Sequence, residues 1–173
     1  MNGSRIEFYL NKIKIYNMFA LLTRNAFLFI LTFVLLLIIS DIIITGVLFL
    51  IGKLDAGVQF FHDLDLTEQI FWGVIFGPIV ETIIFHFLLL ELLLHMFKKT
   101  KHKEYWVILI SAIPFSLIHY YSIQYKIYSF FAGIIFSSAY ITARKKNMLP
   151  VAVVFMIHAL YNLIAFSYNY FLR

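Results

Sequence analysis

Residues 26–51 read AFLFILTFVLLLIISDIIITGVLFLI, an apolar stretch with a single charged side chain, Asp41. About 20 consecutive apolar residues are enough to cross ~30 Å of hydrocarbon as a helix. The rest of the chain has the same character, because 62% of its 173 residues are hydrophobic and only 13% are charged. In a soluble globular domain about a quarter of the residues are charged. The composition therefore excludes that class and predicts a membrane protein.

Four more apolar spans follow, each close to the length of a membrane crossing. They cover residues 71–97, 105–122, 127–143 and 149–170. The predicted fold class is therefore all-α, a polytopic transmembrane bundle of about five helices. Basic and apolar side chains interleave in residues 1–25, where we expect an amphipathic segment on the membrane surface. We divide the chain into this segment (1–25), a first transmembrane helix (26–51) and a core (70–172).

The basic residues are unevenly distributed between the loops. When the loops are placed on alternate sides, 11 of the 14 Lys and Arg residues share one side. These are Arg5, Lys12, Lys14, Arg24, Lys98, Lys99, Lys101, Lys103, Arg144, Lys145 and Lys146. Positive charge favours the cytoplasmic side, so we expect a multi-pass protein of the cell membrane with its N-terminus in the cytoplasm. The basic clusters are then ordinary cytoplasmic loops, so we expect the lipid bilayer and no nucleic acid as a partner.

Polar side chains inside the apolar spans are few. An ionisable group in lipid is costly and is usually kept for a reason. His158 and Asn162 are four residues apart, so on a helix both project from one face and can address a single point. Phe115 and His119 repeat this interval, which lets the aromatic ring pack beneath the imidazole. Glu81 belongs to the same set.

Prolines precede two of these residues at short range. Pro78 lies three residues before Glu81, and Pro114 lies five residues before His119. A proline inside a helix cannot donate its backbone hydrogen bond, and in a membrane the freed carbonyl needs protein or water as a partner. We expect that water can reach both sites.

Other polar or small residues have structural readings. Glu91 and His95 are spaced as an intrahelical pair. Gly73 with Gly77, and Ser129 with Gly133 and Ser137, place small residues every fourth position, which is typical of close helix contacts. For Asp41 the sequence leaves helix packing and a supporting role at the site equally open. We expect Tyr120, Tyr121 and Tyr125 in an interfacial aromatic belt.

The chain has no cysteine, so disulfides and thiolate metal sites are excluded and any metal would lie on His, Asp or Glu. The sequence lacks the H-E-x-x-H pattern of zinc proteases, and Asn162 is a poor zinc ligand. Glu81 could not easily act as both ligand and base. We therefore expect a site without cofactor, with zinc as the alternative.

The order of these residues resembles the CPBP family of intramembrane proteases, which comprises CAAX prenyl endopeptidases and bacteriocin-processing or immunity proteins of the Abi type. The family motifs are E-E-x-x-x-R, F-x-x-x-H and H-x-x-x-N on successive helices. They correspond here to Glu81–His86, Phe115–His119 and His158–Asn162. The first motif departs from the pattern, because Thr82 stands at the second Glu and His86 at the Arg. Thr82 and His86 could offer each other a hydrogen bond instead of an ion pair.

The resemblance implies an intramembrane endopeptidase that uses a glutamate-activated water. A buried carboxyl group such as Glu81 is suited to take a proton from water and return it to the leaving amine. The resemblance assigns His119 as its partner, while His158 and Asn162 would stabilise the oxyanion; Thr82, His86 and Phe115 would be supporting residues. We expect a hydrophobic or membrane-associated peptide as substrate.

Two other functions are left open by the sequence. Buried Glu, Asp and His side chains also form proton or ion pathways in membranes. The altered first motif also leaves room for a degenerate family member that acts by binding, in immunity or as a partner subunit.

Overall fold

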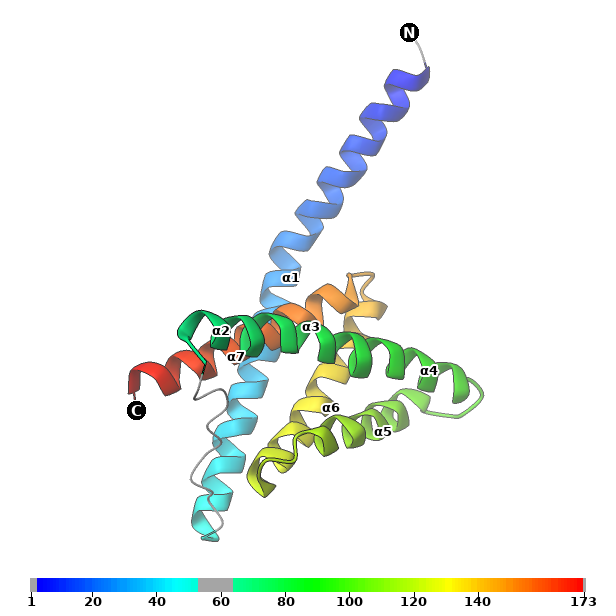
Figure 1. The fold of residues 1–173 in the computed structure, drawn as a ribbon. Helices are drawn as coiled ribbons and strands as arrows, with labels where there is room; N and C mark the ends of the chain where they lie inside the picture. The colour runs from blue at the N-terminus through cyan, green and yellow to red at the C-terminus, as the bar shows by residue number, and fades with distance from the viewer. Residues whose placement is uncertain (1–2, 53–63, 173) are drawn as a thin grey trace.

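The computed structural model is a helical bundle (Figure 1), which confirms the predicted all-α class. It describes the backbone of residues 3–52 and 64–172 and the side chains of residues 25–52 and 64–171. The α-helices in these ranges are α1 (Gly3–Leu50), α2 (Leu66–Ile70), α3 (Gly77–Glu81), α4 (Leu89–Met96), α5 (Lys103–Ile118), α6 (Ile123–Lys145) and α7 (Pro150–Leu172). Two π-helical segments, η1 (Phe71–Phe76) and η2 (Thr82–Leu88), join α2, α3 and α4. We call the resulting continuous unit the composite helix (Leu66–Met96).

Four stretches of the described chain are long and apolar enough to cross a membrane. They are Asn25–Leu50, Leu66–Met96, Ile123–Lys145 and Pro150–Phe171. The predicted span 105–122 corresponds to α5, which has only 16 residues. At 1.5 Å per residue it covers roughly 24 Å, short of the ~30 Å hydrocarbon core. Helix α5 stops early because His119 leaves helical conformation, with φ −92° and ψ 59°.

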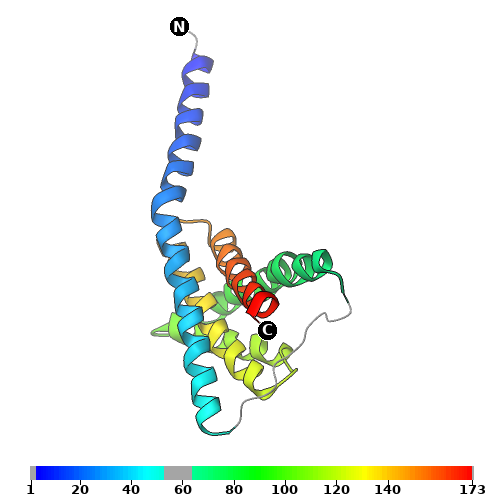
Figure 2. The same cartoon turned by 90° about the vertical axis from the view of Figure 1, so that its left-hand side faces the viewer.

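Helix α1 includes both the first predicted crossing and the residues before it. It is continuous from Gly3 to Leu50, and Figure 2 shows it along one side of the other helices. The side chains of residues 1–24 lie outside the described ones, so a surface position for residues 1–25 stays a prediction. Much of the apolar surface of α1 is exposed, for example at Ile42 and Ile43, as expected for a helix facing lipid.

Helix α6 lies at the centre of the bundle. It carries ten buried residues, among them Phe136 and Ser137. A side chain added at Gly133 would come within 3.1 Å of both the Ala112 Cα and the Phe115 ring on α5. The close contact predicted from the small-residue spacing is therefore confirmed at Gly133, where α5 and α6 pack tightly.

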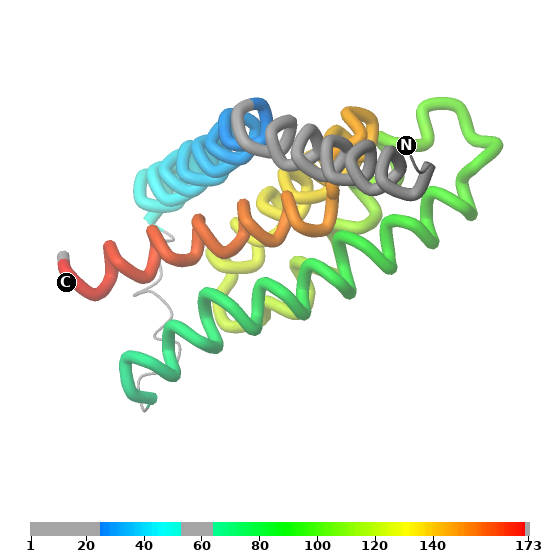
Figure 3. Tube along the Cα trace, turned by 90° about the horizontal axis from the view of Figure 1, so that it is seen from above, coloured from blue at the N-terminus to red at the C-terminus, as the bar shows by residue number. Residues whose placement is uncertain are grey.

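Helix α7 runs between α1 and the composite helix (Figure 3), and it contacts both of them as well as α6. Because His158 and Asn162 lie on α7 and Glu81 lies on the composite helix, this arrangement places the third motif beside the first. Helix α5 packs on α6 and on η2. His119, which follows the last residue of α5, therefore lies near Glu81 as well.

Ion pairs tie the two predicted basic loops to one end of the bundle. Lys145, at the end of α6, pairs with Glu104 at the start of α5. Its neighbour Arg144 pairs with Glu91 of α4. The loops around residues 98–103 and 144–146 therefore lie close together, as the charge pattern requires if both are on one side of a membrane.

Candidate active site

Glu81 lies at a break in helix geometry. It is the last residue of α3, with η1 before that short helix and η2 directly after it. At the end of η1 the Gly77 N–H donates to the Trp72 carbonyl, five residues back, and at the end of η2 Leu89 donates to Ile84. Wider turns of this kind are rare and are frequently found at functional sites. Gly77 suits the first of them, because a Cβ there would lie 2.9 Å from the Trp72 oxygen.

The wide turn leaves the carbonyl of Gly73 without a donor in its own helix. In a regular α-helix Gly77 would donate to it, but Gly77 donates to Trp72 instead, and the next residue, Pro78, has no N–H. The Asn162 side chain of α7 supplies the missing bond, with Nδ2 2.8 Å from the Gly73 oxygen. The freed carbonyl expected near Pro78 thus exists, and a side chain from another helix satisfies it.

Three segments bring an acid and two imidazoles together. The Oε2 atom of Glu81 lies 3.7 Å from His119 Nε2 and 3.7 Å from His158 Nε2. Both histidines are buried, and Glu81 Oε2 is itself buried without a hydrogen-bond partner among the described residues. Because 3.7 Å exceeds the length of a direct hydrogen bond, the three groups lie close together but Glu81 Oε2 forms no direct hydrogen bond with either imidazole.

The orientation of His119 is fixed by the end of its helix. The last carbonyls of a helix lack intrahelical donors, and the His119 N–H turns to Ser116 rather than to Phe115. The His119 ring takes the free Phe115 carbonyl, with Nδ1 2.6 Å from the oxygen. A carbonyl can only accept, so Nδ1 carries the proton. In the neutral ring Nε2 is then an acceptor directed at Glu81.

Two phenylalanines form an aromatic support for the imidazoles. Phe115 lies 4.7 Å from His119, centroid to centroid, so the ring packs against the imidazole as the four-residue interval predicts. Phe115 also contacts His86 at 4.9 Å and His158 at 6.3 Å. Phe136 of α6 lies 4.5 Å from His158 and 5.2 Å from His86. Phe115 is therefore within contact distance of three imidazoles.

Thr82 and His86 are fully buried on η2, but they do not bond to each other as the sequence suggested. The Thr82 hydroxyl has no hydrogen-bond partner among the described residues. His86 turns to α6, where its Nδ1 lies 3.4 Å from the Ser137 hydroxyl. The wide turn of η2 changes the rotation of the helix between the two residues, which a regular spacing could not anticipate.

Two aromatic residues of the site were missed by the sequence reasoning. Phe136 has no polar atom and no motif partner. Tyr125 lies in a cluster of tyrosines that indicates a membrane interface, yet its ring meets the His119 ring edge to face at 5.1 Å. A signal was present for Tyr125, because it lies on the first turn of α6, directly after the short loop that follows His119.

An apolar groove lies along the same stretch of the composite helix, although the Glu81 side chain is not part of its lining. The groove has a volume of ≈ 400 Å³ and runs between η2 with the end of α3 and the start of α7. Its lining includes Ile79, Thr82, Ile83, Leu149 and Phe155. A hydrophobic chain could lie in this groove next to the helix that carries Glu81.

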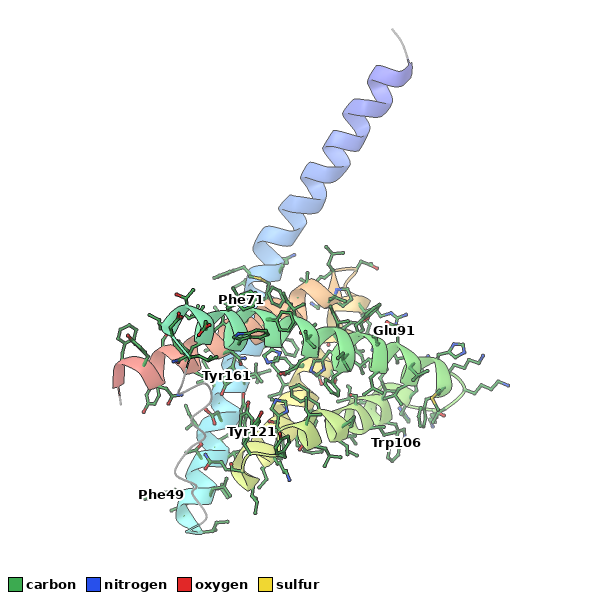
Figure 4. All side chains as sticks on the ribbon, viewed as in Figure 1. Phe49, Phe71, Glu91, Trp106, Tyr121 and Tyr161 are labelled. Atoms are coloured by element: carbon green, nitrogen blue, oxygen red, sulfur yellow. The ribbon has the colours of Figure 1, made fainter. Side chains whose placement is uncertain are left out.

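The two remaining intramembrane carboxylates have structural partners. Asp41 of α1 accepts a hydrogen bond from the Tyr161 hydroxyl of α7 at 3.3 Å, at the point labelled in Figure 4 where α7 meets α1. Glu91 accepts hydrogen bonds from Arg144 and Tyr140 on α6. The pairing of Glu91 with His95 is therefore wrong, because an interhelical arginine takes the carboxylate instead.

The described residues contain no group of three or more His, Asp or Glu side chains placed to hold a metal ion. The acid at the centre of the site is contacted by two imidazoles from separate segments, both held against aromatic rings.

The fold and site together define a multi-pass membrane protein with a glutamate and histidines at its centre. The family model for the Rce1-like type II CAAX prenyl endopeptidases matches residues 63–164, which is more than half of the 173-residue chain. The chain belongs to this family of membrane proteases, within the CPBP group. The match includes all three motifs and leaves α1 outside. No curated protein and no solved structure matches the chain.

Proposed function

We propose that this protein hydrolyses peptide bonds within the membrane by means of a water molecule activated by Glu81. The observation that carries the proposal is the convergence of His119 and His158 on one buried oxygen of Glu81, 3.7 Å from each. Such a centre offers both a proton acceptor and hydrogen-bonding groups to a small molecule placed beside it.

In the proposed reaction Glu81 takes one proton from the water, and the oxygen of the water forms a bond to the substrate carbonyl carbon. The bare Nε2 of His119 accepts a hydrogen bond from the same water and orients it. The carbonyl oxygen becomes negative in the tetrahedral intermediate. When the C–N bond breaks, Glu81 returns its proton to the leaving amine, so that protons and electrons balance without a covalent enzyme intermediate.

His158 and Asn162 are proposed to stabilise the oxyanion. A side-chain amide carries two N–H groups, and the bond to Gly73 uses one of them. The second N–H is available to the substrate. His158 would donate through Nε2, the atom that lies nearest Glu81. Each such donor is typically worth a factor of 10²–10³ in turnover.

The substrate is proposed to be a hydrophobic or membrane-associated peptide. The ≈ 400 Å³ groove between the composite helix and the start of α7 is lined almost wholly by aliphatic and aromatic side chains, which supports a hydrophobic chain as its occupant. The family description reads type II CAAX prenyl endopeptidase, which makes a prenylated CAAX peptide the second candidate. A prenylated peptide and an unprenylated hydrophobic peptide are therefore the two probes to compare.

The test uses the full-length protein in liposomes with two fluorogenic peptides, one farnesylated at a C-terminal CAAX sequence and one hydrophobic and unprenylated. We expect cleavage products, identified by mass spectrometry, that disappear in Glu81→Gln. Glu91→Gln is the matched control, since it alters a glutamate of the same composite helix that is already bonded to Arg144. Equal cleavage by Glu81→Gln and the wild type would overturn the mechanism.

Metal dependence is tested on the same preparation. We expect activity to survive a chelator and metal analysis to find no stoichiometric zinc. Stoichiometric zinc that is lost together with activity would replace the metal-free mechanism with a zinc protease. Proton flux that depends on Glu81, with no cleaved product, would instead favour an ion pathway, and a cellular phenotype that survives Glu81→Gln would favour a degenerate binding protein.

We propose a cytoplasmic N-terminus and cytoplasmic basic loops in the cell membrane. The proximity of Arg144 and Lys145 to Glu91 and Glu104 supports a common side for the two loops. The absence of cysteine makes the test simple, because Lys101→Cys and Lys126→Cys each introduce a single thiol. In intact cells an impermeant maleimide should label position 126 and not position 101; the reverse pattern would invert the topology.

A further inference from the structure

A chain of buried hydroxyl groups ends on His86. Ser111 of α5, Ser137 of α6 and His86 of η2 are all fully buried. The Ser111 hydroxyl lies 3.0 Å from the Ile108 carbonyl oxygen and 2.9 Å from the Ser137 hydroxyl. Ser137 in turn lies 3.4 Å from His86 Nδ1. Three helical segments thus contribute to one polar connection inside the bundle.

The direction of every bond in this chain is determined by its first member. The Ile108 carbonyl can only accept, so Ser111 donates its single hydrogen there. Ser111 must then accept from Ser137, and Ser137 must accept from His86. His86 therefore carries its proton on Nδ1, and its Nε2 is a bare acceptor in the neutral ring.

The bare nitrogen of His86 lies in the same aromatic setting as His158. Both imidazoles pack on the Phe136 ring, at 5.2 Å and 4.5 Å, and both contact Phe115. His86 Nε2 and His158 Nδ1 are each buried without a hydrogen-bond partner among the described residues. Buried polar atoms are rarely left in that condition.

We propose that His86 is a positioning residue for His158, and this inference rests on the proposed function. If His158 donates to the oxyanion through Nε2, its Nδ1 is an acceptor, as is His86 Nε2. One buried water donates both of its hydrogens, one to each nitrogen, and satisfies the pair. The Ser111–Ser137–His86 chain thereby fixes the rotation and tautomer of His158.

The experiment compares Ser137→Ala with Ser138→Ala, its neighbour on α6. Among the described residues the Ser138 hydroxyl bonds only back to the Ile134 carbonyl of its own helix, so it is a matched control for the loss of one hydroxyl. With the peptide that the wild type cleaves, we expect kcat of Ser137→Ala to fall about five- to tenfold at unchanged KM, the usual effect of one lost hydrogen bond. Ser138→Ala should keep both constants.

A second readout does not depend on activity. Nitrogen-15 NMR of histidine-labelled protein in lipid, at mildly alkaline pH where imidazoles are neutral, reports which ring nitrogen carries the proton. We expect His86 protonated on Nδ1 and His158 protonated on Nε2 in the wild type, and mixed tautomers for both in Ser137→Ala. Assignment uses the spectra of His86→Asn and His158→Asn.

Two results would overturn the proposal. One is a wild-type His86 that is protonated on Nε2, and the other is Ser137→Ala with wild-type kcat and wild-type His158 spectrum. A protein that cleaves neither peptide but shows the expected tautomers contradicts the proposed function alone, so that the two failures are distinguishable.

Discussion

Two glutamates ten residues apart on the composite helix have opposite surroundings. Glu91 accepts from Arg144 at 2.7 Å and 2.8 Å and from the Tyr140 hydroxyl at 2.9 Å. Glu81 has imidazole nitrogens at 3.7 Å, and its Oε2 forms no hydrogen bond within the described residues. The Glu91 carboxylate is occupied by contacts that hold two helices together. Glu81 Oε2 can still accept hydrogen bonds from a substrate or a water.

This difference supports the proposal that Glu81 is the reactive acid and that Glu91 is a structural one. A buried polar group without a partner reduces stability by about 1–3 kcal/mol, so it is retained where it serves another purpose. Glu91 lies next to an arginine that neutralises it, near a loop rich in lysine. Glu81 lies between two wide helical turns and faces histidines, which can exchange protons. Glu81 and Glu91 are the same residue type on the same composite helix, so the difference between them comes from the side chains that surround each one.

The largest effect is expected for His119→Asn. An asparagine amide can keep the bond to the Phe115 carbonyl that His119 Nδ1 makes, while the nitrogen facing Glu81 is lost. We expect turnover to fall by about 10²–10⁴-fold, the usual contribution of an acid–base partner, with unchanged thermal unfolding in detergent. Wild-type turnover in a well-folded His119→Asn protein would show that Glu81 acts without it.

A smaller effect on turnover is expected for Asn162→Ala, which combines both kinds of role. It removes an oxyanion donor, about 10²–10³-fold in turnover, and it leaves the Gly73 carbonyl without its partner, about 1–3 kcal/mol of stability. Asn169→Ala, at an exposed position of the same helix, is the control. If only stability changed, Asn162 would be a helix cap and not part of the chemistry.

Glu91→Gln should affect stability alone. A neutral amide keeps the Tyr140 contact but loses the charge of the pair with Arg144. Because both side chains are partly exposed, we expect the free energy of unfolding to fall by only about 1 kcal/mol, measured by thermal unfolding with peptide cleavage assayed in parallel. Loss of cleavage at full stability would contradict the contrast between the two glutamates.

The smallest effect is expected for Thr82→Val. The two side chains have nearly the same shape, and the Thr82 hydroxyl has no partner among the described residues. Removal of the hydroxyl should leave the free energy of unfolding within about 0.5 kcal/mol of the wild-type value, or raise it slightly. A clear drop in turnover would reveal that this hydroxyl supports Glu81 during the reaction, as the resemblance suggests for its position.

The apolar spans predicted the helical class, because hydropathy is a local feature, and the resemblance to the CPBP family implied the convergence of Glu81 with His119 and His158. The sequence did not predict that α5 is shorter than a crossing, since hydropathy continues through His119 while the helix ends there. Nor could regular periodicity place His86 against Ser137, because η2 departs from 3.6 residues per turn. The Asp41–Tyr161 contact depends on how two distant helices meet.

The bond between Gly73 and Asn162 has a consequence for how the helices align. It exists because Gly77 donates to Trp72 instead of Gly73 and the next residue, Pro78, has no amide hydrogen, so that the Gly73 carbonyl is left open to a side chain of another helix. Sliding α7 by one turn, ~5.4 Å, would leave the carbonyl facing the wrong side chain. The missing amide hydrogen on the composite helix thus helps to set the axial position of α7 beside it. That position determines which part of the composite helix His158 faces, and here His158 faces Glu81.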